Sequence, residues 1–203
     1  MGPAQATPER RRGYVLQYAT IAWNVLEVAV ALALGVGAGS LALVAFGLDS
    51  LVEVFASLVV IWHLAEPDDG RRRTGPALRL VAAAFTVLAL GLLAGSAHSL
   101  WSQTRPEPSS LGIVYLAVTA VVMFGLARMK RRAGVDLGSE PLLHEAEITR
   151  LDGWLASGIL GALAGNALLS WWWADPLAGA AVALLAARQA ARTWAEGAVP
   201  AAR

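Results

Sequence analysis

The chain of 203 residues lacks cysteine and carries few charges of either sign. Without cysteine, disulfide bonds and thiolate metal sites are excluded, so a metal ion would depend on oxygen atoms and on the three histidines. Charged residues make up 15% of the sequence, against about 25% in an average soluble domain. The net charge of +1 argues against nucleic acid as a partner. Because no nucleophile–base pair or glycine-rich phosphate loop occurs either, we expect neither an enzyme nor an organic cofactor.

Long apolar runs dominate what is present. Hydrophobic residues account for 57% of the chain, and the mean hydropathy is +0.55. A run of about 20 apolar residues crosses a bilayer as one helix. Runs near this length occupy residues 14–35, 40–64, 77–100, 111–129, 152–171 and 176–192. We therefore expect an all-α integral membrane protein, a bundle of six transmembrane helices in one domain at 14–192, with short tails at 1–13 and 193–203.

The arginines indicate how this bundle is oriented. Basic clusters lie at residues 10–12, 71–73 and 128–132, in the first tail and in the two longer links. The three shorter links contain a single basic residue, Arg105. Because basic residues accumulate on the cytoplasmic side, this pattern predicts that both termini are cytoplasmic. We expect a multi-pass protein of a bacterial plasma membrane, with the lipid bilayer as its surroundings.

Two acids interrupt the second apolar run. Asp49 and Glu53 lie four residues apart, which places them on one helix face with β-carbons about 5–6 Å apart. Each charge costs roughly 2.5–3.5 kcal/mol at mid-bilayer on insertion scales. Two such charges repel each other unless a proton or a cation lies between them. The pair therefore predicts metal or proton handling, the alternative being two carboxyls that share a proton and hold helices together.

Other acids are candidates of lower specificity. Glu27 lies in the first run and shares a helix face with Asn24, three residues earlier. It could act as an outer metal ligand, a proton carrier or the partner of an arginine. Asp152 opens the fifth run and forms a stripe with Thr149 and Glu145. By itself, Asp152 is more typical of a solvated acid at the cytoplasmic mouth of a helix.

These segments resemble the cation diffusion facilitator family of proton-coupled divalent metal exporters. The second run reads GLDSLVEVFASL and is similar to the family's second helix, in which two acids four residues apart supply half of the transport site. The stretch DGWLASGILGALAGNALLSWWWADPLAGAAVALL resembles the family's fifth helix, its outer turn with an Ala-Asp-Pro step, and its sixth helix. The resemblance covers residues 14–192.

The resemblance implies a proton-coupled transporter that exports zinc or a similar divalent cation, such as manganese or ferrous iron. The metal ligands that it implies are Asp49, Glu53 and Asp152, with Glu27, Glu145 and Thr149 as secondary candidates. The partners would be the metal ion, protons and the bilayer, with homodimer contacts, if any, inside the membrane.

The chain departs from the family pattern in two places. Four residues before Asp152 the family usually has histidine or aspartate, and this chain has Ile148. Either Glu145 and Thr149 replace that ligand, or Glu27 and water do, or the protein does not transport as the family does. The alternative is therefore a non-transporting subunit of the same fold that senses metal or binds a partner. The family's cytoplasmic domain is not recognised after the sixth run, so we expect a short bacterial member that lacks it.

Overall fold

Six long helices make up the part of the chain that the computed structural model describes, residues 8–64, 70–137 and 140–198. They are α1 (Pro8–Ala38), α2 (Leu41–Leu64), α3 (Gly70–Trp101), α4 (Ser110–Leu137), α5 (Glu140–Leu169) and α6 (Ala174–Ala198). These ranges contain no strand, which confirms the expected all-helical chain. The reason is that a backbone surrounded by lipid must satisfy its hydrogen bonds within its own segment.

Except for α2, which matches its run, the helices are longer than the apolar runs that predict them. Within the described ranges, three stretches are long and apolar enough to cross a membrane: Tyr18–Ala38, Leu78–Trp101 and Ser110–Asp136. The link between the fourth and fifth runs is almost entirely helical, because α4 continues to Leu137 and α5 begins at Glu140. Arginine, lysine, alanine and glutamate in this link favour helix, so the helices continue beyond their apolar parts.

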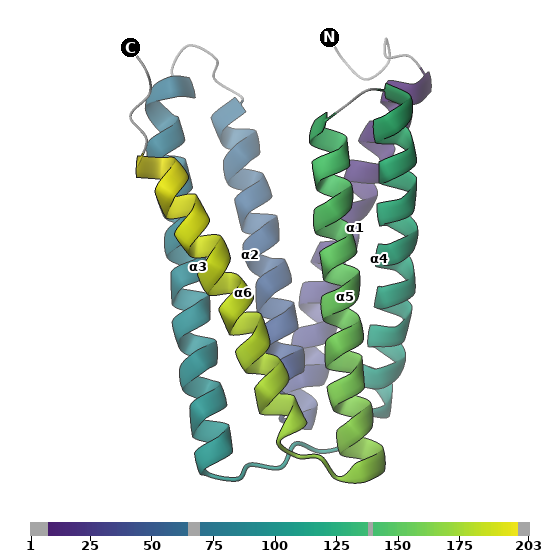
Figure 1. The fold of residues 1–203 in the computed structure, drawn as a ribbon, viewed down its shortest axis with the longest axis vertical. Coiled ribbons are helices and arrows are strands. Elements are labelled where there is room, and N and C mark those ends of the chain that lie inside the picture. Colours follow the sequence, from purple (N-terminus) through teal and green to yellow (C-terminus); the bar gives the residue numbers. More distant parts are fainter. Residues whose placement is uncertain (1–7, 65–69, 138–139, 199–203) are drawn as a thin grey trace.

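The helices pack in closely associated pairs. α3 lies along α6, α4 along α5, and α1 along α2, while α2 also contacts α3 and α6. In Figure 1, α2, α3 and α6 form one side of the bundle, and α1, α4 and α5 form the other. The buried core between them includes Leu43, Phe46, Leu116, Ile159 and Val182. α1 begins and α6 ends at the same end of the bundle (Figure 1), here called the terminal end; the other end is called the turn end.

Hydrogen bonds between distant segments fasten the turn end. The amide of Glu107, in the link between α3 and α4, donates to the carbonyl of Ala38 at 2.9 Å. Nδ2 of Asn166 on α5 donates to the carbonyl of Pro106 in the same link at 3.0 Å. These bonds join α1 and α5 through one connecting segment.

The carboxylate of Asp175 accepts further hydrogen bonds at this end of the bundle. An aspartate before a proline at a helix start is typically the N-cap of its own helix. Here the carboxylate of Asp175, which is 2% exposed, instead caps α2: it accepts hydrogen bonds from the hydroxyl of Ser40 and from the amide of Leu41 at 2.8 Å. The Ser40 hydroxyl in turn accepts from the amide of Leu43 at 3.2 Å. One side chain of α6 therefore satisfies free amides at the positive end of α2.

Small residues allow α1 and α2 to approach closely. Gly39 forms the turn between them with a φ of 62°, a conformation that glycine adopts without strain. A β-carbon added at Gly35 would lie 2.7 Å from the backbone nitrogen of Val44. One added at Gly47 would lie 3.0 Å from the side chain of Leu32. Membrane helices associate through such small residues because lipid provides no hydrophobic force between them.

Alanine substitutions in α1 should test this close approach. The Gly35→Ala variant should be destabilised, because overpacking against backbone costs about 1–3 kcal/mol, more than the helix gains from alanine. Gly37→Ala is the matched control: no atom of a neighbouring element lies within 4 Å of its β-carbon position, and its stability should be unchanged or higher. Thermal unfolding of both variants in detergent measures the difference. Equal melting temperatures for the two variants would contradict the packing described.

Candidate cation-binding site

Glu27 of α1 places a carboxyl group in the interior of the bundle. The residue is 2% exposed. Its Oε1 accepts a hydrogen bond from Nε1 of Trp23 at 2.8 Å, and its Oε2 accepts one from the hydroxyl of Ser50 on α2 at 3.1 Å. Both donors are neutral, so they solvate the carboxylate without compensating its charge. A carboxyl group buried in this way has to hold a proton or to lie beside a cation.

Glu53 of α2 is tied to α1 in the same way. One of its carboxylate oxygens accepts a hydrogen bond from Nδ2 of Asn24 at 3.0 Å. Asn24 is one helical turn before Glu27, and Ser50 is one turn before Glu53. The two bonds between the helices, Asn24 to Glu53 and Ser50 to Glu27, are therefore successive rungs of one antiparallel pair. The expected shared face of Asn24 and Glu27 is the face that α1 presents to α2.

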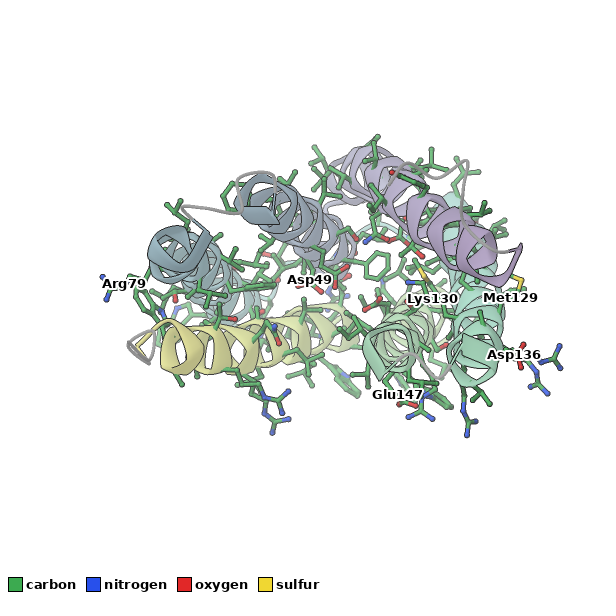
Figure 2. The ribbon with its side chains drawn as sticks, turned by 90° about the horizontal axis from the view of Figure 1, so that it is seen from above. Asp49, Arg79, Met129, Lys130, Asp136 and Glu147 are labelled. Carbon is green, nitrogen blue, oxygen red and sulfur yellow. The ribbon has the colours of Figure 1, made fainter. Side chains whose placement is uncertain are left out.

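Asp49 completes the acidic neighbourhood on α2. Figure 2 shows its side chain inside the ring of helices, pointing away from the outer surface. It is close enough to Glu27 for the two charges to interact. The structure therefore brings Asp49, Glu53 and Glu27 to one region between α1 and α2.

Neutral oxygen atoms lie in the same region. Oδ1 of Asn24 is buried and has no hydrogen-bond partner among the described residues. From α4, Tyr115 lies within electrostatic range of Glu27, and Thr119 is fully buried one turn further along. Carboxylate, amide and hydroxyl oxygens are the ligands that hard divalent cations prefer. The described residues contain no group of three or more acids or histidines close enough to hold one ion. A cation here would therefore combine an acid or two with neutral oxygens.

The remaining candidates, Glu145, Thr149 and Asp152, belong to α5. α5 packs mainly along α4 and touches α2 only slightly. Asp152 is partly buried on α5, and Ile148 is 38% exposed. The side chain of Glu145 falls outside the described residues. The described acids and histidines form no group of three around one ion, so Asp152 does not converge with Asp49 and Glu53 on one ion, and its role as a ligand stays a prediction.

Thr149 is hydrogen-bonded to the ammonium group of Lys130. Its hydroxyl accepts a hydrogen bond from Nζ of Lys130 at 3.0 Å, and both residues are almost completely buried between α4 and α5. Figure 2 shows Lys130 pointing into the bundle. An ammonium group so close to the Thr149 oxygen disfavours a divalent cation at that oxygen, because like charges repel strongly in a low dielectric.

Lys130 is the residue that sequence reasoning missed. By charge alone, the segment 128–132 is a basic cluster at the cytoplasmic surface, and charge does not tell which of its residues point inward. The signal lies in the helical period, because the buried positions of α4 recur every three or four residues as Leu116, Thr119, Met123, Leu126 and Lys130. Lys130 falls on the inward stripe, whereas Arg128, Arg131 and Arg132 do not.

Replacing Thr149 by valine should separate a structural role from a ligand role. The variant leaves the Lys130 ammonium without one of its acceptors, and we expect the free energy of unfolding to fall by about 1–3 kcal/mol. Thr193→Val is the matched control, because the buried hydroxyl of Thr193 donates only to the carbonyl of Gln189 in its own helix. Thermal unfolding and metal binding are measured together. Unchanged stability with lost metal binding would identify Thr149 as a ligand instead.

Comparisons with known proteins agree with the arrangement of helices. A family model described as the cation efflux transmembrane domain matches residues 18–199. An uncharacterized transporter from the cyanobacterium Synechocystis is 30% identical over 149 residues, which is 68% of this chain and 48% of that protein. The chain thus spans about half the length of this relative. The family is one of multi-pass membrane transporters and not of enzymes, as the sequence resemblance indicated. The chain belongs to the cation efflux family.

Proposed function

We propose that this protein carries a divalent metal cation across the plasma membrane in exchange for protons, through a six-span bundle with both termini in the cytoplasm. The observation that carries the proposal is the group of Asp49, Glu53 and Glu27 between α1 and α2, in which Glu27 is buried and the two α2 acids are half-buried. The two hydrogen-bond donors on Glu27 are neutral, so its charge is left for a proton or a transported ion to balance. Membership of the cation efflux family supports a cation as the transported species.

The proposed binding site uses oxygen ligands from α1 and α2. Asp49 and Glu53 would supply the carboxylates and the free amide oxygen of Asn24 a neutral ligand, while Glu27 would lie nearby as a proton carrier. Such a set is the kind that manganese and ferrous iron prefer, whereas the family resemblance favours zinc. Competition among the three ions in one transport assay determines the preference.

Proton coupling follows from the same carboxyl groups. When the cation leaves, two or more acids remain within interaction distance in a low dielectric, and their mutual repulsion favours uptake of protons. The protonated, neutral site can then return across the membrane without an ion. In a second conformation the turn end would have to open, which requires the bonds of Glu107, Asn166 and Asp175 at that end to break.

Neutral variants of the acids test the proposal in proteoliposomes with an imposed pH gradient. Asp49→Asn, Glu53→Gln and Glu27→Gln should each reduce metal uptake at least about tenfold, the effect of about 1.4 kcal/mol of lost stabilisation. Asp152→Asn should have a smaller effect, because α5 has little contact with α2 and Asp152 does not converge with the α2 acids on one ion. Glu107→Gln, an exposed acid of the turn end, is the control for net charge and should transport normally. Near-normal uptake by both α2 variants would rule out this site.

The second candidate is a non-transporting subunit that senses metal or binds a partner. Two observations favour it: Ile148 stands where the family usually has a ligand, and the hydroxyl of Thr149 is engaged by Lys130. The same proteoliposomes distinguish the candidates when metal binding and metal flux are both measured, with and without the pH gradient. Binding without flux under either condition would support the second candidate.

A further inference from the structure

A groove separates α4 and α5 on the outer face of the bundle, toward the terminal end. Its volume is about 650 Å³. Four arginines line it, together with two acids: Arg128, Arg131, Arg132, Arg150, Asp136 and Glu147. Figure 2 shows the labelled Asp136 and Glu147 on the outer faces of α4 and α5, while Lys130 points inward. The groove is therefore separate from the interior acids, and its described lining residues carry an excess of two positive charges, four guanidinium groups against two carboxylates.

The arginines reach the groove from both walls. Arg131 and Arg132 lie three and four residues after Arg128, so both are about one turn from it on the same side of α4. Arg150 stands on α5 and is paired with Glu147, three residues earlier. All four arginine side chains are exposed. Guanidinium groups bind phosphate oxygens in a forked, two-bond geometry, and several of them around one groove favour a phosphate ligand.

Beside the arginines, the groove leads to an apolar surface. Phe124 lines the groove and packs edge-on against Trp154 of α5, with ring centroids 5.2 Å apart. Gly153 makes this contact possible, because a β-carbon there would lie 3.0 Å from the Phe124 ring. Trp154 is 63% exposed, and Leu151 and Val121 beside it on the two helices are also largely exposed. Phe124 precedes Arg128 by about 6 Å along the axis of α4.

The order of these side chains matches the layers of a bilayer. Going along α4 from the terminal end, the arginines come first, Phe124 second and the exposed Val121 third; on α5, Arg150 and Leu151 come before Trp154. Indole rings prefer the headgroup region, and basic residues flank it on the cytoplasmic side. A soluble phosphate compound would use the arginines but would leave the aromatic and aliphatic surface uncovered. A phospholipid would cover both.

We propose that the groove between α4 and α5 is a binding site for one anionic glycerophospholipid. Its phosphate binds Arg128, Arg131 and Arg132, while its acyl chains lie over Trp154 and Val121. The excess of positive charge selects an anionic headgroup over a zwitterionic one, whose own cation would meet the arginines. Because α4 and α5 are held together at this level by the buried bond between Lys130 and Thr149, the lipid binds a preformed groove.

The experiment uses the full chain, purified in a neutral detergent, with phosphatidylglycerol as the probe. The groove variant carries Arg128→Gln, Arg131→Gln and Arg132→Gln. The control variant carries Arg79→Gln, Arg188→Gln and Arg192→Gln, which removes the same three charges from exposed positions on α3 and α6. Figure 2 shows the labelled Arg79 on the opposite side of the bundle from α4. Lipid retained through purification is counted by native mass spectrometry, and thermal stability is titrated with added lipid.

We expect the wild type and the control variant to bind phosphatidylglycerol with equal affinity. The groove variant should bind it roughly 100-fold more weakly, at about fivefold for each basic residue near a lipid surface. If the triple variant does not fold, Arg131→Gln alone should show about a fivefold loss. Equal binding of phosphatidylcholine, equal stabilisation by soluble glycerol phosphate, or an equal loss in both triple variants would each overturn the proposal. Metal flux does not enter this measurement, so it is independent of the proposed transport function.

Discussion

The packing of α1 against α2 depends on the carboxyl groups of Glu27 and Glu53, each of which accepts a hydrogen bond from the other helix. Asn24 donates to Glu53 and Ser50 donates to Glu27, which fixes the two helices in one antiparallel register. These bonds require a close approach of the helices, and the glycines at 35 and 47 permit it. The same bonds solvate the carboxylates with neutral donors, so the charge of Glu27 stays available to a mobile proton or cation. A buried acid whose charge a fixed basic residue had neutralised would bind a cation much less well.

α4 presents one face to the interior of the bundle and another to the outer surface, and its helical period assigns residues to each face. Its inward stripe contains hydrophobic residues and Thr119, and it ends in Lys130, which is bonded to Thr149 on α5. Its outward stripe carries the arginines of the groove and, one turn further into the apolar part, Phe124. The positive charge of Lys130 is therefore held in the interior between α4 and α5, whereas Asp49 and Glu53 belong to α2.

The two ends of the bundle differ in how they are held. At the turn end, the carboxylate of Asp175 caps α2, and the link between α3 and α4 is bonded to both α1 and α5. The carboxylate of Asp175 on α6 lies at the positive end of the α2 dipole, so the turn end connects α6 to α2. α2 therefore has its first turn anchored to α6 while its acids lie further along the same helix. Movement of α6 would accordingly be transmitted to the helix that carries Asp49 and Glu53.

The sequence by itself determined the helical class and the number of helices, since long apolar runs have few ways to satisfy their backbone in lipid. It also identified Asp49, Glu53 and Glu27, because acids are conspicuous in apolar runs. It could not determine which acids meet, since Asp152 and Thr149 share a stripe on α5 but α5 lies against α4. The capping of α2 by Asp175 does not follow from local pattern, and the helical period of α4 places Lys130 inward only once the face that α5 covers is known. Those contacts join residues far apart in the chain, or depend on which face a neighbouring helix covers, and tertiary packing alone decides both.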